Sequence, residues 1–255
     1  SFIQTKSILV VIAVVGAVWS CHSNAEAQVI YANGTQPTAG NGTSAIAASD
    51  GNVYDIGNWE LWAGGTPWLN GGTTPESSPI YAFQLPSLGS LSDPFASATL
   101  GLTFYAKDGV PSFNIDLYGL GVSSSPTVVA GDYYSGALDA SADVTLLENN
   151  ILTPSTSMTS VDSPNNVFST DLSSYLNTAY AGGANAGQYV ILRFSADISG
   201  ITSDVNYHIE SNPGSSTPAD LPQISYTLTP APEPSPIAVC GLAGLMVVMT
   251  IRRRC

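Results

Sequence analysis

The stretch QYVILRFSAD (Gln188–Asp197) is the most apolar strand-like segment of the sequence, and our expectation of the fold starts from it. β-branched and aromatic side chains fill much of it, and these residue types favour extended backbone. A short apolar run of this length is typical of a strand buried inside a sheet. We therefore expect this segment at the centre of a β-sheet, with the other strands around it.

Segments with strand-like alternation recur on both sides of this centre. Leu100, Leu102 and Phe104 share one face of SATLGLTFYA (Ser97–Ala106), as the period of two in a half-buried strand requires. SFNIDLYGLG (Ser112–Gly121) alternates in the same way. Further strands are expected at Ile80–Leu88, Asp143–Leu152, Val205–Ser211 and Gln223–Thr229, after an opening strand that begins at Val29.

Two local signals connect these strands. The turn-forming run Lys107-Asp108-Gly109 predicts a hairpin between its two neighbouring segments. Asn166–Gly183 begins as a strand and continues as a short helix, because apolar residues recur at helical spacing from Leu172. Asp171 is the expected N-cap of this helix, and Gly182 is its expected end.

About eight or nine short strands at roughly 10- to 20-residue spacing, with one helical insertion, predict an all-β fold. The specific expectation is a jelly-roll β-sandwich, formed as one domain by residues 28–229. An N-terminal signal helix in residues 1–27 and a C-terminal transmembrane helix in residues 230–255 are expected to flank it.

Charge and cysteine content narrow the class of function. Between Gln28 and Pro232 there are 17 acidic residues but only two cations, Lys107 and Arg193. Such a chain repels the phosphates of nucleic acids and of anionic lipid headgroups, which disfavours both as partners. The same region has no cysteine, so an exported domain must be held together by its hydrophobic core, for which this length is sufficient.

Residues 1–27 have the parts of a secretory signal peptide. Lys6 precedes an uncharged apolar run, and Ala25-Glu26-Ala27 places small residues where signal peptidase needs them, so we predict cleavage before Gln28. A lipoprotein signal with an acylated Cys21 is an alternative, although the bulky Trp19 fits it poorly. An uncleaved span is a further alternative, but the apolar run is too short to cross a bilayer.

The C-terminal stretch TPAPEPSPIAVCGLAGLMVVMTIRRRC (Thr229–Cys255) has three parts in a fixed order. Alternating prolines stiffen the chain, an uncharged segment follows from Pro236 to Ile251, and Arg252, Arg253 and Arg254 end it. As a helix, the uncharged segment reaches only about 24 Å, which is short of a hydrocarbon core of roughly 30 Å. A plain tail anchor is the alternative, but a short span suits a transient signal better.

Pro232-Glu233-Pro234, the apolar segment and the terminal arginines together resemble the PEP-CTERM sorting signal of bacterial envelope proteins. The resemblance implies recognition by an exosortase, a membrane transpeptidase that cuts near the motif, with signal peptidase acting at the other end. It implies an exported protein of the cell envelope, surface or extracellular matrix, which meets the membrane through its C-terminal segment before processing. Such proteins are typical of bacteria that make exopolysaccharide.

A second resemblance covers the region between the two signals. Several segments are similar, in the same order, to those of DNRLRE-type domains: IYAFQLPSLGSLSDPFASATLGLTFYA (Ile80–Ala106), VFSTDLSSYLNTA (Val167–Ala179), where a strand leads into a short helix, QYVILRF (Gln188–Phe194), YHIESNP (Tyr207–Pro213) and LPQISYTL (Leu221–Leu228). These domains are jelly rolls that resemble carbohydrate-binding modules, so the resemblance implies that fold and a polysaccharide partner. The sequence departs from the pattern at Tyr81, where an arginine commonly opens the strand.

Aromatic residues gather in one glycine-rich segment, on expected strand ends or loops, and form the candidate glycan-binding site: Tyr54, Trp59, Trp62 and Trp68. Sugar rings stack on flat aromatic faces, while neighbouring amides or carboxylates bind their hydroxyl groups. Trp59 and Trp62 fall on opposite faces of a strand, so only one of them can share a platform with Trp68. Packing in the core is the alternative. Tyr133-Tyr134, in a glycine-bounded loop, is a second candidate.

Residues for catalysis or metal binding are few. His208 is the only histidine between the signals, and alternation puts it on one face with Asn206 and Glu210, which we expect to be solvated. One histidine without cysteine disfavours a zinc site. The carboxylates that could pair for glycoside cleavage are Glu60, Glu76, Asp116, Glu148 and Glu210. No cofactor is expected except a structural calcium ion, with ligands from Asp50, Asp55 and the Asn-Gly loops.

We therefore expect a non-catalytic surface or matrix protein that binds exopolysaccharide. Two alternatives stay open: a secreted glycan-active hydrolase or lyase, and a purely structural coat or adhesion component. Two carboxylates in a cleft would favour the enzyme, and exposed tryptophans would favour the glycan-binding protein. If both features are absent, the structural component is favoured.

Overall fold

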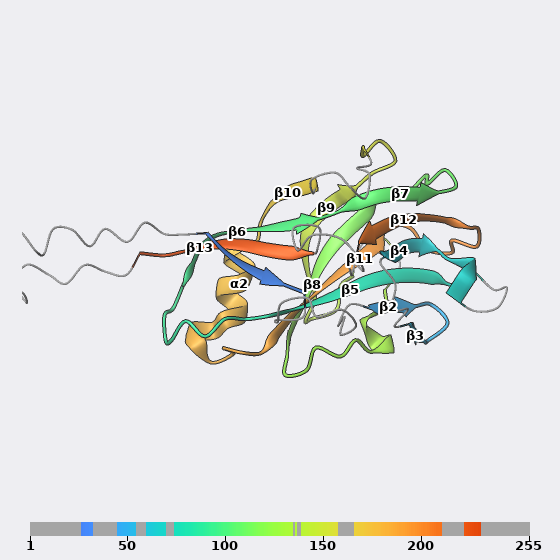
Figure 1. Ribbon diagram of the computed structural model, residues 1–255. Coiled ribbons are helices and arrows are strands. Elements are labelled where there is room, and N and C mark those ends of the chain that lie inside the picture. Colours follow the sequence, from blue (N-terminus) through green and yellow to red (C-terminus); the bar gives the residue numbers. More distant parts are fainter. Residues whose placement is uncertain are drawn as a thin grey trace, which may run out of the picture. The chain divides into compact units, whose positions relative to one another are not determined.

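The computed structural model describes residues 27–32, 45–54, 60–69, 74–134, 136, 139–157, 166–210 and 222–230. Residues Glu26–Leu228 form one compact unit. Within the described residues the chain is mainly β-strand with one short α-helix, and all strand pairs are antiparallel (Figure 1). The prediction of an all-β fold with a helical insertion is confirmed.

The strands of the described residues form two sheets. The small sheet has four strands in the order β1 (Gln28–Tyr31), β13 (Gln223–Leu228), β6 (Phe95–Leu102) and β10 (Asn166–Asp171). The large sheet has nine strands, seven of them in the order β7 (Phe104–Asp108), β12 (Val205–Glu210), β4 (Glu60–Gly65), β5 (Glu76–Gln84), β11 (Tyr189–Ala196), β8 (Ile115–Ser123) and β9 (Thr145–Leu152). The other two are β2 (Ala45–Ala48), which pairs with β5, and β3 (Val53–Tyr54), which pairs with β2.

Short helical elements complete the described residues. They are α2 (Ser173–Tyr180) and the 3-10 turns η1 (Pro67–Leu69), η2 (Ala130–Asp132) and η3 (Ala181–Gly183). None of the helices in this part of the chain is long and apolar enough to cross a bilayer. The predicted signal segment and the predicted transmembrane segment lie outside the described residues.

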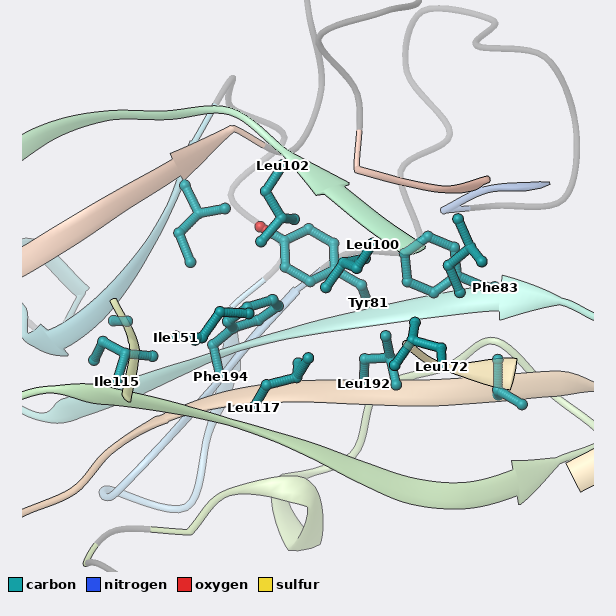
Figure 2. Packing of buried hydrophobic residues seen from close by; sticks show 14 of the residues in the cluster. Tyr81, Phe83, Leu100, Leu102, Ile115, Leu117, Ile151, Leu172, Leu192 and Phe194 are labelled. Carbon is teal, nitrogen blue, oxygen red and sulfur yellow. The ribbon is translucent and has the colours of Figure 1, made fainter. Parts of the chain in front are cut away.

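The main hydrophobic core lies between the two sheets. Leu100 and Leu102 of β6 face Tyr81 of β5 and Phe194 of β11 (Figure 2), and each of the four is at most 1% exposed. The rings of Tyr81 and Phe194 meet edge to face, with their centroids 5.6 Å apart. Because burial of each such side chain contributes roughly 1.5–3 kcal/mol, these contacts stabilise the packing of one sheet on the other.

One apolar run connects the two sheets directly. The segment expected to be a single strand divides at Thr103 into β6 of the small sheet and β7 of the large sheet. The predicted inward face is nevertheless correct, because Leu100, Leu102 and Phe104 are all buried. The Thr103 carbonyl accepts a hydrogen bond from the Glu210 main-chain N–H at 2.9 Å, so the backbone stays paired where the strand turns the corner.

The hairpin expected at Lys107-Asp108-Gly109 is wrong. Strand β7 pairs with β12, while β8 pairs with β11 and β9. The chain leaves β7 at Gly109, whose φ is +62° and whose missing Cβ would lie 2.8 Å from the Asp204 carbonyl oxygen. The strands on either side of the turn separate: β7 lies at one end of the strand order of the large sheet, and β8 lies between β11 and β9 near the other end.

The start of helix α2 also differs from the prediction. Leu172 is the N-cap rather than Asp171, and no side chain caps the helix. Asp171 is still paired in β10 opposite Thr99, and the Leu172 N–H donates to the Ala98 carbonyl at 2.8 Å, so sheet pairing fixes where the helix begins. The helix ends at Tyr180, because Ala181 takes the left-handed conformation just before the expected Gly182.

Strand β11 lies between β5 and β8, which confirms that QYVILRFSAD is central. Its inward face, with Leu192 and Phe194, joins the main core. Its outward face is buried as well: Ile191 is 7% exposed, Arg193 2% and Ser195 not at all. Something must therefore cover the outer side of the large sheet.

The cover comes from the described residues between β8 and β9, here called the cover loop (residues 124–134, 136 and 139–144), and Arg193 holds it. One Arg193 amino group donates to the Asp132 carbonyl at 3.0 Å, and the other forms a 2.8 Å ion pair with Asp139. The guanidinium also stacks against Tyr118 of β8 and Tyr134 of the loop, 5.0 and 5.4 Å from the ring centres. Arg193 therefore joins the sheet to the loop through charge, hydrogen bonds and ring contacts together.

Replacing Arg193 by Met should destabilise the domain by about 3 kcal/mol, because the buried Asp139 carboxylate would lose its charged partner. Urea unfolding measures the difference, and limited proteolysis should show earlier cutting in the cover loop. Asp143→Asn is the matched control, since Asp143 is exposed in the same loop. This substitution should change the free energy of unfolding by no more than about 0.5 kcal/mol. Equal effects of the two substitutions would contradict the role given to Arg193.

Candidate functional site

The aromatic residues expected to form a glycan platform occupy separate positions. Tyr54 lies in β3, and its hydroxyl donates a hydrogen bond to Asp50. Trp62 lies inside β4 rather than at a strand end or in a loop. The backbone of Trp68 lies in η1, while its side chain and the whole of Trp59 are outside the described residues. The platform therefore stays a prediction, and Trp62 has a different neighbour.

That neighbour is His208. Trp62 and His208 are opposite each other in the pairing of β4 with β12, and the indole N–H lies 3.2 Å from the imidazole Nδ1. The two rings meet nearly edge on, at an angle of 81°. Trp62 is half-buried, and its side chain packs against the main core.

Two carboxylates hold the imidazole from opposite edges. Glu60 Oε2 lies 3.0 Å from Nδ1, and Asp108 Oδ2 lies 3.2 Å from Nε2. Glu60 comes from β4 and Asp108 from the end of β7, so three adjacent strands build the arrangement. We call Glu60, Trp62, Asp108 and His208 the histidine cluster. Its side chains range from 10% exposed for His208 to 46% for Asp108.

The expectation that Asn206, His208 and Glu210 form a solvated face is wrong. They do share a face, but as whole residues Asn206 and Glu210 are each 1% exposed and His208 is 8% exposed. Asn206 donates to the Gly65 carbonyl at 3.0 Å and to Asp204 at 3.2 Å. The alternation was read correctly, but both faces of the large sheet are covered here, so polar residues are buried with partners.

The environment favours a protonated His208. Burial lowers the pKa of the imidazole, but the hydrogen bond and charge of Glu60, followed by those of Asp108, outweigh burial and raise the pKa above its ordinary value. In the protonated ring, Nδ1 donates to Glu60; in a neutral ring, the same nitrogen can accept the Trp62 N–H instead. The cluster can thus exchange one hydrogen bond for another when it loses a proton.

The arrangement does not match a metal centre. Glu60 and Asp108 lie on opposite edges of the ring, so one ion cannot be bound by both carboxylates and the imidazole. Among the residues that the structure describes, no group of three or more His, Cys, Asp or Glu side chains could hold a metal ion. Of the expected calcium ligands, Asp50 is engaged by the Asn52 N–H at 3.0 Å and by Tyr54, and Asp55 lies outside the described residues.

The carboxylates considered for glycoside cleavage mainly serve the fold. Glu76 is 7% exposed and accepts hydrogen bonds from the Tyr133 hydroxyl at 3.2 Å and the Gly200 N–H at 3.0 Å. Asp116 accepts the Asn150 N–H at 2.7 Å, and burial raises its pKa despite that bond. Glu210 is buried, Glu60 belongs to the histidine cluster, and burial raises the pKa of Glu148.

Lys107 is half-buried, and its charged group is engaged by carbonyl oxygens as that of the buried Arg193 is. Its ammonium group donates to the Pro154 and Thr156 carbonyls at 2.7 and 3.0 Å and lies 5.6 Å from the centre of the Tyr207 ring. Burial lowers its pKa. The second glycan candidate has a structural place too: Tyr133 binds Glu76, and Tyr134 stacks on Arg193.

Sequence reasoning missed the contacts that build the histidine cluster. Glu60-x-Trp62 and Asn206-x-His208-x-Glu210 both alternate with a period of two, and this is the signal that could have paired them. The register that brings them together depends on pairing between strands far apart in sequence, which a single sequence does not specify. Asp108 was assigned to a turn.

No protein-family model matches this sequence, and neither does any curated protein. The two resemblances noted from the sequence therefore stay predictions. The sorting motif Pro232-Glu233-Pro234 and the terminal Arg252, Arg253 and Arg254 lie outside the described residues.

The stability that His208 confers should depend on pH. Because its folded pKa is raised above the ordinary 6.5, the contribution is complete below that value and is lost as the pH rises through the folded pKa. The unfolding free energy of the wild type should exceed that of His208→Gln by more at about pH 5.5 than at about pH 8.5. An equal difference at both pH values would exclude this coupling.

Glu60→Gln tests the cause of the raised pKa. Removing the carboxylate charge should lower the pKa of His208, which NMR of the imidazole protons follows directly. The substitution Glu148→Gln is the matched control, because Glu148 lies in the distant strand β9 and should leave the His208 titration in place.

Proposed function

We propose that this chain is an exported, non-catalytic surface or matrix protein that signal peptidase and an exosortase process at its two ends. The observation that carries the proposal is where the compact unit begins and ends in the sequence. Residues Glu26–Leu228 form a compact unit with its own core, and the segments whose sequences are typical of targeting signals lie before and after it in the sequence. A domain without cysteine that relies on a large apolar core is suited to life outside the cell without disulfides.

We further propose a jelly-roll topology related to carbohydrate-binding modules. Two antiparallel sheets around a shared core, joined by a strand that passes from one sheet to the other at Thr103, support this more specific fold. The short helix that follows β10 and precedes the central strand β11 also agrees with the order of segments in the DNRLRE-type pattern.

A non-catalytic role is supported by how the reactive side chains are used. The one histidine between the signals is held between two carboxylates, and the candidate acids Glu76 and Asp116 accept hydrogen bonds from neighbouring strands and loops. A catalytic acid or base needs a position from which it can reach a substrate. The glycan-active enzyme is therefore the less favoured alternative.

The ligand we propose is a neutral polysaccharide. Lys107 and Arg193 are engaged by carbonyl groups and a buried carboxylate, while Asp93, Asp143 and Asp204 are exposed. An anionic polymer would be repelled by such a surface, whereas hydroxyl groups of a neutral one can bind amides and carboxylates. Trp68 is the better contact residue, because Trp62 is committed to His208.

Mass spectrometry of surface material should find the protein without the residues that follow the proline stalk. The substitution of Pro232, Glu233 and Pro234 by Ala should leave the arginine tail in place, because the peptidase would lose its recognition motif. Replacing Pro218 by Ala is the matched control. Mature wild-type protein that still carries Arg252, Arg253 and Arg254 would contradict exosortase processing.

Retention on an immobilised neutral glucan tests the ligand. The processed protein should be retained, and Trp68→Ala should weaken retention by about tenfold, as loss of an aromatic contact does in other interfaces. Trp62→Phe is the control with retention unchanged, and an acidic polysaccharide should retain neither protein. Absence of retention on any glycan would favour the purely structural coat or adhesion component.

A further inference from the structure

The first strand begins at the residue that export would leave as the N-terminus. Ala27 is exposed and lies before β1, whose first residue is Gln28. A cut after Ala27 therefore removes no part of the strand. It leaves a glutamine with a free α-amino group at the edge of the small sheet, where β1 pairs only with β13 among the described strands.

The side chain of Gln28 has a specific partner. The Tyr226 hydroxyl donates a hydrogen bond to the Gln28 Oε1 atom at 2.7 Å, and the two residues are directly opposite each other in the β1–β13 pairing. Tyr226 is only 4% exposed, and its ring packs edge to face against Phe95 with centroids 5.2 Å apart. The hydroxyl is thus aimed at the amide carbonyl by a buried, closely packed ring.

We propose that the exported protein begins with pyroglutamate, formed from Gln28 with the Tyr226 hydroxyl assisting as a hydrogen-bond donor; the inference rests on the export proposed above. In this reaction the neutral α-amino nitrogen attacks the side-chain Cδ. Negative charge develops on Oε1, which is the atom that Tyr226 contacts. The N–Cδ bond forms, the Cδ–Nε2 bond breaks, and one ammonia molecule leaves with a proton from the attacking nitrogen.

Tyr226 is suited to this positioning role. Burial raises the pKa of its hydroxyl, so the group stays protonated and available as a donor at physiological pH. No oxidant, metal or second enzyme is required, because the nucleophile and the electrophile belong to the same residue. Ring closure turns the Gln28 side chain toward its own nitrogen, and the proposal requires the Tyr226 hydroxyl to stay in contact with Oε1 as the side chain turns.

Cyclisation would change the charge of the domain. A free α-amino group is mainly protonated near neutral pH, and it would add a cation at the edge of the small sheet. Pyroglutamate carries no charge there, so cyclisation leaves the positive charge of the processed domain to side chains such as Lys107 and Arg193. A blocked N-terminus also gives aminopeptidases no starting point.

The experiment follows the N-terminal peptide of the exported full-length chain. The protein is produced in an exporting bacterial host, purified at once and incubated, and samples are digested for mass spectrometry. The wild-type peptide should begin at residue 28 and lose the mass of one ammonia molecule with time. In Tyr226→Phe the rate should fall about tenfold, the value of one lost hydrogen bond to a developing charge.

Two controls separate assistance from a general effect on folding. The first control is Tyr31→Phe, which changes a tyrosine in the same strand as Gln28 and should cyclise at the wild-type rate. In the second, wild type and Tyr226→Phe are unfolded in urea, where both should cyclise at the same rate. A peptide that starts elsewhere, one that keeps its ammonia, or equal folded rates for wild type and Tyr226→Phe would each overturn the proposal. The C-terminal peptide is measured separately, so failure of exosortase processing is distinguishable from failure here.

Discussion

Burial of strand β11 on both faces is the constraint on which the rest of the domain depends. Its inward residues meet the small sheet across the main core, and its outward residues need a second covering layer. The chain supplies that layer with an irregular segment instead of a third sheet, and it fixes the segment through Arg193. A buried guanidinium is tolerated because carbonyl, carboxylate and ring contacts replace water on most of its surface.

Periodicity in the sequence was enough to predict much of this architecture. The central strand, the inward face of Leu100, Leu102 and Phe104, and the strand-to-helix segment before β11 all follow from local patterns. Pairing between distant strands was not predictable: the Lys107-Asp108-Gly109 turn does not close a hairpin, and Leu172 rather than Asp171 starts the helix. In the site, alternation put His208 on the correct strand face, but burial of that face depends on tertiary covering that local pattern does not encode.

In this acidic domain, the few positively charged side chains hold separate segments together. With few cations available, Arg193 and Lys107 are each engaged by several acceptors, and Glu60 and Asp108 favour the charged form of His208. Each lies where separate segments meet. Arg193 joins the large sheet to the cover loop, Lys107 joins strand β7 to the chain after β9, and His208 joins three adjacent strands. The remaining carboxylates repel one another less because these positive groups are distributed across the large sheet.

The pairing of β1 with β13 has a mechanical consequence. The first and last of the described strands lie side by side in the small sheet (Figure 1), and β13 is hydrogen-bonded to β1 on one side and to β6 on the other. If the domain is tethered at its C-terminal end, drag from flowing water reaches the tether through β13. Pulling along that strand loads two ladders of hydrogen bonds in shear at the same time, so neither is opened one bond after another. The order of strands thus gives a tethered domain resistance to tension at the point where the load enters.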